Sequence, residues 1–224
     1  ELPIDKDYVT YVWFDALINY ISSIGYSNNN EKFRKFWPAN IHLIGKDILT
    51  THCVYWPTML MSIGLDLPKT IFAHGWWLNK DSKMSKSVGN VINPLDLIDE
   101  FDEDSLRFFL MRDMKLGQDS NFSEESFITR YNSDLANDLG NLLSRITNLI
   151  NKFFRGKLSS GFDKSPNGKI VQAESSKVIS FTNECFRKMK INEAIDNSMN
   201  CIKSINKYIE VMAPWNLVKT DMSA

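Results

Sequence analysis

The alternation of apolar and polar residues separates a first part with strand-like runs from a second part with helical stripes. Runs of β-branched and aromatic residues predict buried strands at residues 8–14, 41–44 and 70–78. The segments between them predict a helix from Asp15 to about Ser23, a short one that ends at Trp37-Pro38, and one that follows Gly45-Lys46-Asp47 and runs to Gly64. This order of strands and helices predicts a parallel sheet, whose ligands bind beyond the carboxyl ends of its strands.

Helical patterns fill the rest of the chain. Short helices are expected at residues 94–101 and 105–112, followed by a turn at residues 117–121. Longer helices are expected from Ser123 to Phe154, from Val171 to Lys190 and from Asn192 to Met212, with an exposed loop at residues 156–170. We therefore expect an α/β domain over residues 1–117 and an all-α helix bundle over residues 118–224.

Composition excludes several classes of protein. The 224 residues carry 26 basic and 27 acidic side chains, so a net charge of −1 gives no global nucleic-acid signature. Cys53, Cys185 and Cys201 lack paired metal spacing, which fits free thiols in a reducing compartment. Apolar runs fall short of the ~18 residues that a membrane span needs, and the first residues do not resemble a signal peptide.

The most specific stretch is Lys83-Met84-Ser85-Lys86-Ser87, on a polar loop between an aromatic strand and the helix start at Asn93-Pro94. Ammonium groups on such a loop suit a polyphosphate whose charge grows as a bond breaks. By composition alone, a solvated surface loop is the alternative. A chance match to this pentapeptide has odds on the order of 10⁻⁴. It resembles the KMSKS signature of the class I aminoacyl-tRNA synthetases.

Further segments make the resemblance more specific. They occur in the order seen in the methionyl-tRNA synthetase family, and the similarity covers essentially the whole chain and is greatest to the bacterial and organellar branch. The matching segments are Tyr11–Tyr20, His42–Asp47, His52 with Tyr55-Trp56-Pro57, Phe72–Trp76 and Lys83–Ser87. The resemblance implies the second half of a Rossmann-type catalytic domain with the KMSKS loop and connector helices over residues 1–117. It implies an anticodon-binding helix bundle over residues 118–224.

The family resemblance implies a methionine pocket formed by Trp13, Leu17, Tyr20 and His52. Aromatic faces suit a thioether, because sulfur–aromatic contacts are favourable by ~0.3–1.5 kcal/mol. Ordinary core filling is the alternative for Trp13 and Tyr20, and a core or surface histidine that does not contact a ligand is the alternative for His52. Leu17 departs from the Pro that some members carry, which affects the detailed shape of the pocket.

For ATP, the resemblance implies Gly45 and Asp47 at the ribose, His74 and Gly75 near the adenine, and the catalytic lysines Lys83 and Lys86 near the phosphates. Taken alone, Asp47 fits a helix cap better than a contact to ribose. The methionine carboxylate attacks the α-phosphate and pyrophosphate leaves, so the protein positions the reactants and neutralises charge. Mg²⁺ is expected with the ATP, and neither a metal site nor a zinc site is expected in this chain.

Matched to the family, Asn141, Arg145 and Trp215 are the positions that recognise the anticodon of methionine tRNA, elongator and initiator. Arg and Asn present fixed donor and acceptor patterns to splayed-out bases, and Trp can stack on one. From the residues alone, a solvated helix side and a tryptophan that locks helix ends are the alternatives.

The class I His-x-Gly-His signature is missing from the sequence. We expect the first half of the catalytic domain to lie outside this chain, and the chain alone to be inactive. The resemblance implies a cytoplasmic, bacterial-type methionine–tRNA ligase, with an organellar origin and the oligomeric state open. Another class I synthetase for an apolar amino acid and, for this chain alone, a non-catalytic tRNA-binding module remain alternatives.

Overall fold

The computed structural model describes residues 3–85, 87, 89–157, 161 and 164–216. Contacts divide the chain into two compact units, Glu1–Trp76 and Trp77–Ala224. Residues 117 and 118, between which the sequence predicts a domain boundary, both lie inside the second unit. The predicted domain boundary therefore differs from the division between the two units, and it stays a prediction.

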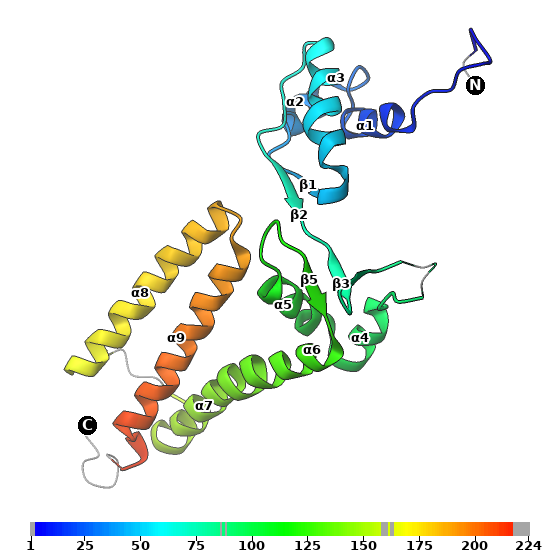
Figure 1. Cartoon of the computed structure of the whole chain (residues 1–224). Helices are drawn as coiled ribbons and strands as arrows, with labels where there is room; N and C mark the ends of the chain where they lie inside the picture. Colours follow the sequence, from blue (N-terminus) through cyan, green and yellow to red (C-terminus); the bar gives the residue numbers. More distant parts are fainter. Residues whose placement is uncertain (1–2, 86, 88, 158–160, 162–163, 217–224) are drawn as a thin grey trace. The chain divides into compact units, whose positions relative to one another are not determined.

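The first unit combines helices with a short parallel sheet (Figure 1). Its elements are α1 (Val12–Ser22), α2 (Asn30–Phe36), β1 (His42–Gly45), the 3₁₀-helix η1 (Lys46–Ile48), the π-helix η2 (Thr51–Tyr55), α3 (Trp56–Ser62) and β2 (Ile71–His74). Strands β1 and β2 pair in parallel, with Gly45 opposite His74. The predicted parallel pairing of these two strands is therefore confirmed.

The strand predicted at residues 8–14 is wrong. Residues 8–11 have no regular secondary structure, and α1 begins at Val12. Trp13, Leu17 and Ile21 are spaced by four residues, so a helix places them on one face against the core. Because the helix begins at Val12, Asp15 lies in its first turn and does not follow a strand.

Aromatic and aliphatic side chains from three helices and their flanks form the core of this unit. Its buried members are Leu17, Ile21, Trp37, Trp56 and Leu60. Trp37 satisfies its indole N–H with the Asp66 carbonyl at 3.0 Å. A buried tryptophan needs such a partner because an unpaired buried donor is costly.

The second unit begins with a three-stranded sheet in the order β4-β3-β5. Its strands are β3 (Trp77–Asn79), β4 (Ser82–Lys83) and β5 (Ser120–Phe122). The single strand predicted at residues 70–78 is thus two strands of different sheets, separated at Gly75-Trp76. The sequence also missed β5 within the predicted turn, because parallel pairing with β3 and burial of Phe122 stabilise a segment of only three residues.

Helices make up most of the second unit. They are α4 (Pro94–Phe101), α5 (Glu103–Asp113), α6 (Glu124–Arg130), the π-helix η3 (Tyr131–Gly140), α7 (Asn141–Phe154), α8 (Pro166–Arg187) and α9 (Ile191–Met212). Ser123 caps α6 as predicted, and helical structure continues to Phe154. Helix α8 starts five residues earlier than predicted, because Ser165 accepts the Gly168 N–H and Pro166 occupies the first turn. Helices α8 and α9 lie side by side (Figure 1).

A buried carboxylate joins four helical segments of the second unit. Asp134 of η3 is 1% exposed and accepts from Arg112 Nε of α5 at 3.2 Å and from Arg130 Nη1 of α6 at 3.5 Å. Arg112 also binds Asp196 of α9. The negative charge of Asp134 is thus compensated by two arginines, as a buried ion requires.

We predict that Asp134→Ala destabilises the second unit by about 3–5 kcal/mol, because Arg112 and Arg130 both lose the buried carboxylate that they share. The matched control is Asp196→Ala, which removes a side chain that binds the same Arg112 but is 44% exposed. It should cost no more than about 1 kcal/mol. Urea unfolding followed by circular dichroism measures both, and equal losses would contradict this role of Asp134.

Candidate functional site

In the first unit, the four residues predicted to form the pocket come from α1 and η2. Trp13, Leu17 and Tyr20 lie on α1, and His52 lies on η2. The Tyr20 hydroxyl is 3.0 Å from His52 Nε2, and the ring centres of Trp13 and His52 are 6.0 Å apart, edge to face. Leu17 packs in the core cluster against which Trp13 rests. The structure therefore brings all four residues into one region.

The direction of the Tyr20–His52 hydrogen bond follows from the other nitrogen of the imidazole. His52 Nδ1 is 2.9 Å from the Ile48 carbonyl, which can only accept, so Nδ1 carries a proton. In the neutral ring Nε2 is then an acceptor, and the Tyr20 hydroxyl donates to it. Burial raises the pKa of Tyr20, which keeps this donor protonated.

The four side chains differ in their access to solvent. Leu17 and His52 are each 1% exposed, whereas Tyr20 is 36% exposed and Trp13 is partly buried. A ligand can therefore reach Tyr20 and Trp13 directly. Leu17 and His52 shape the surface from behind, and His52 acts on it through the Tyr20 hydroxyl.

Two further residues belong to this cluster and were not assigned a role from the sequence. The His42 ring lies 4.3 Å from the Tyr20 ring, and Trp56 Nε1 donates to His42 Nε2 at 3.1 Å. Burial, and secondly the charge of His52, lower the pKa of His42. Their contacts join residues 14 to 36 positions apart, which no local spacing predicts.

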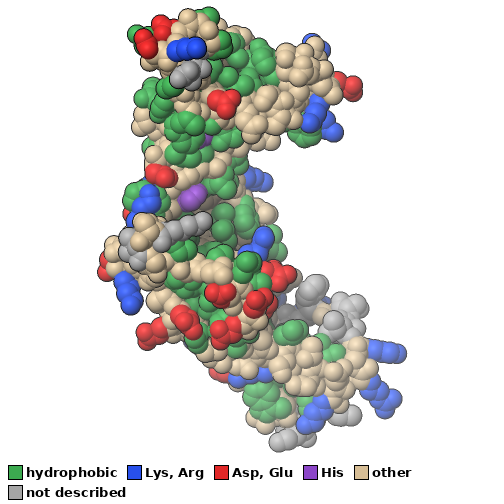
Figure 2. Space-filling model, turned by 90° about the vertical axis from the view of Figure 1, so that its right-hand side faces the viewer, with side chains coloured by type: hydrophobic (Ala, Val, Ile, Leu, Met, Phe, Trp, Pro, Cys, Tyr) green, Lys and Arg blue, Asp and Glu red, His purple; other side chains and the backbone are tan. Residues whose placement is uncertain are grey.

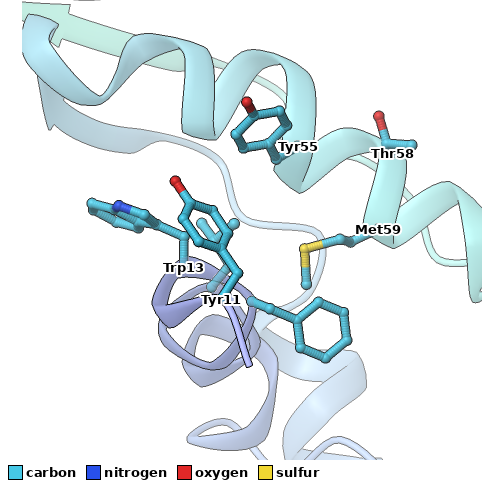
Figure 3. Close-up of a pocket in the computed structure, with 7 residues that line it drawn as sticks. Tyr11, Trp13, Tyr55, Thr58 and Met59 are labelled. Atoms are coloured by element: carbon cyan, nitrogen blue, oxygen red, sulfur yellow. The ribbon is translucent and has the colours of Figure 1, made fainter. Parts of the chain in front are cut away.

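An apolar cavity of about 440 Å³ lies beside the N-terminal half of α1. In Figure 3, the Tyr11 ring lies below Tyr55, with Trp13 on its left and Met59 on its right. Trp13 and Leu17 line this cavity, but Tyr20 and His52 do not. Several of its walls are exposed apolar side chains, and hydrophobic surface is visible over the first unit in Figure 2.

The residues predicted for the ribose and the adenine of ATP lie at the carboxyl ends of β1 and β2. Gly45 and His74 are directly opposite in the register, Asp47 follows in η1, and Gly75 follows β2. A Cβ at position 45 would lie 2.6 Å from Asp47 Oδ1, so a larger residue there would displace this carboxylate. The His74 ring bonds the Gly75 carbonyl through Nδ1 at 2.7 Å, which leaves Nε2 as the acceptor of the neutral ring.

In the second unit, Lys83 lies on the exposed strand β4, and Lys86 lies outside the described residues. Asn90 holds together the two ends of the loop that follows Lys83. Its side chain donates to the Lys83 carbonyl at 3.2 Å and accepts the Ser85 N–H at 2.8 Å, and its own carbonyl accepts from Asn79 Nδ2 at 2.9 Å. Asn90 is thus a functional candidate that the sequence did not single out, although it lies only three residues after the end of the signature at Ser87.

The candidate base-recognising residues lie on α7 and beyond α9. Asn141 and Arg145 are one helical turn apart on α7, and Arg145 Nη1 binds Glu210 Oε1 of α9 at 3.0 Å. Trp215 follows the end of α9 and is 39% exposed. The ion pair brings Arg145 to the end of the helix that precedes Trp215.

Within the described ranges, no group of three or more His, Cys, Asp or Glu side chains is arranged to hold a metal ion. None of the helices that the structure describes has both the length and the apolar character needed to cross a membrane.

Comparisons with known proteins agree on one family. A family model described as tRNA synthetases class I (M) matches residues 1–147. The methionine–tRNA ligase of Rickettsia bellii is 47% identical, with 99% of this chain and 44% of the relative covered. That of Clostridium tetani is also 47% identical, with 97% of this chain and 34% of the relative covered. This chain therefore spans less than half the length of these relatives.

A solved structure supports the same grouping. Mycobacterium tuberculosis methionyl-tRNA synthetase in complex with methionyl-adenylate matches with a TM-score of 0.91 and 39% identity, over 99% of this chain and 44% of that one. The predicted fold class, an α/β part with a parallel sheet followed by a helical part, is confirmed.

We predict that Asn90→Ala makes trypsin cleavage after Lys83 several-fold faster, because two hydrogen bonds that close the loop are lost. The control is Asn93→Ala, which removes the cap of α4 but none of the bonds across the loop. Mass spectrometry of the peptides released with time measures both rates. If the two variants are cleaved equally fast, Asn90 does not hold this loop closed.

Proposed function

The chain belongs to the class I (M) tRNA synthetases, and we propose that it is the part of a methionine–tRNA ligase that binds methionine, carries the KMSKS loop and recognises the anticodon. The whole activity is proposed for the longer polypeptide, because the curated relatives are more than twice as long as the segment that this chain matches.

The observation that carries the proposal is the cluster of Trp13, Tyr20 and His52. Its accessible surface consists of aromatic rings, and the hydroxyl of Tyr20 is committed to His52. Such a surface favours a flexible, polarizable thioether over a charged or strongly hydrated side chain. The Mycobacterium tuberculosis relative binds methionyl-adenylate, and we extend this ligand to the present chain.

For ATP, used as its Mg²⁺ complex, we propose Gly45 and Asp47 at the ribose and His74 and Gly75 near the adenine. Their common location at the carboxyl ends of two parallel strands supports this assignment. Lys83 and Lys86 are proposed to neutralise the charge of the leaving pyrophosphate, and the role of Lys86 rests on the motif alone. The methionine carboxylate attacks the α-phosphate, so no protein nucleophile is required.

For tRNA, we propose that Asn141, Arg145 and Trp215 contact the anticodon of methionine tRNAs, elongator and initiator. Arg145 and its partner Glu210 are 41% and 60% exposed. Such exposed pairs contribute only about 0–1 kcal/mol, so Arg145 can exchange Glu210 for a base at little cost. Trp215 offers an exposed ring on which a base can stack.

The test is methionine-dependent exchange between ATP and pyrophosphate, in this chain and in a polypeptide that extends it to the length of its relatives. We expect exchange with methionine in the extended polypeptide, none with isoleucine, and none in the chain alone. Preference for isoleucine would remove the methionine assignment. Exchange by the chain alone would contradict the proposal that the reaction needs further segments.

We predict that Trp215→Ala in the extended polypeptide weakens binding of methionine tRNA by about 1–3 kcal/mol, the contribution of one stacked base. The control is Phe186→Ala, which removes a comparably exposed ring from α8. Filter binding measures affinity, and exchange should be unchanged in both variants. A Trp215→Ala protein with full tRNA affinity would remove this residue from the anticodon site.

A further inference from the structure

We propose that His42 is a positioning residue for the methionine site, because its buried ring fixes the plane of Tyr20 from behind. This inference rests on the proposed function for the identity of the ligand. It concerns a residue of β1 that none of the assignments to methionine, ATP or tRNA includes.

The contact between the two rings is the closest aromatic approach among the described residues of this unit. The centres of the His42 and Tyr20 rings are 4.3 Å apart, and their planes are inclined by 31°. His42 is 6% exposed, whereas Tyr20 is 36% exposed. One side of Tyr20 is therefore covered by His42, and part of the remainder is open to a ligand.

His42 itself is held in place from the side of the core. Its main-chain N–H donates to the Thr70 carbonyl at 2.9 Å, and its Nε2 accepts the indole N–H of Trp56 at 3.1 Å. Trp56 is 1% exposed and packs between Tyr20 and Trp37, with ring separations of 5.9 and 6.1 Å. The orientation of the His42 ring is thus set by a residue that is itself immobilised by packing.

Tyr20 is consequently fixed at two places. His42 sets the tilt of its ring, and His52 sets the position of its hydroxyl. If the ring at position 42 is lost, Tyr20 can rotate toward the space behind it, and its hydroxyl then moves away from His52 Nε2. A ligand that packs on Tyr20 would meet a different surface, although His42 does not touch the ligand.

This role requires His42 to be neutral. The titratable groups that face its ring are Tyr20 and His52, and the His42 and His52 centres are 6.4 Å apart. Protonation at Nε2 would remove the acceptor for Trp56 and place a charge near His52. Burial and the nearby His52 lower the pKa of His42, which favours the neutral ring.

Two double variants isolate the ring at position 42. His42→Phe/Trp56→Phe keeps an aromatic ring, and His42→Leu/Trp56→Phe removes it. Both lack the indole N–H, so neither leaves a buried donor without an acceptor. Leu60→Ala controls for general loss of stability, because Leu60 is fully buried in the core cluster that also contains Trp56.

The first readout is the KM for methionine and for ATP in exchange by the extended polypeptide. We expect the Leu variant to raise the KM for methionine about 10-fold relative to the Phe variant, which corresponds to about 1.4 kcal/mol. The KM for ATP should be equal in the two variants, and Leu60→Ala should leave both constants unchanged. Equal methionine constants in the two double variants, or parallel changes in both substrates, would overturn the proposal.

The second readout does not depend on activity. The ¹⁵N resonance of His52 Nε2 in the 224-residue chain reports whether it accepts from Tyr20. We expect the Leu variant to shift this resonance to the position found in Tyr20→Phe, and the Phe variant to keep the unmodified position. If both retain that position, His42 does not orient Tyr20. If the unmodified extended polypeptide shows no exchange, the proposed function fails, and this resonance alone decides the role of His42.

Discussion

The hydrogen-bonding capacity of one imidazole constrains the site of the first unit. A neutral histidine has a single N–H, and His52 gives it to the Ile48 carbonyl. The Tyr20 hydroxyl must then act as the donor to Nε2, which leaves the ring of Tyr20 to face a ligand. This bond fixes the position of the Tyr20 hydroxyl, and the His42 ring packs against the ring of Tyr20. The proposed methionine specificity therefore depends on the hydrogen bond between buried His52 and partly exposed Tyr20.

In the second unit, too, polar groups with specific partners hold neighbouring segments in place. Asp134 is buried between two arginines, and Asn90 bonds the main chain at both sides of a short loop. In each case a polar group satisfies its partners in only one arrangement of the neighbouring segments. Polar groups with few alternative partners thus fix the local geometry, while the apolar clusters supply the favourable burial.

The sequence predicted the elements whose signals are local. Helical spacing and caps, such as Ser123 before α6 and Asn93 before α4, located most helices within a few residues. The errors arose where pairing decided the outcome. Residues 8–11 have strand-forming side chains but no strand partner in the described structure, whereas β5 has a weak sequence but pairs with β3. Family resemblance supplied Trp13, Leu17, Tyr20 and His52, but His42, Trp56 and Asn90 act through contacts that only the folded chain shows.

The most direct test of the central claim is the location of bound methionine. Nuclear Overhauser contacts can be measured between methionine labelled with ¹³C in its methyl group and the aromatic rings of the extended polypeptide. We predict contacts from the methyl group to Tyr20 and Trp13. Saturating methionine whose methyl group contacts Tyr55 and Met59 of the apolar cavity, and not Tyr20, would contradict it.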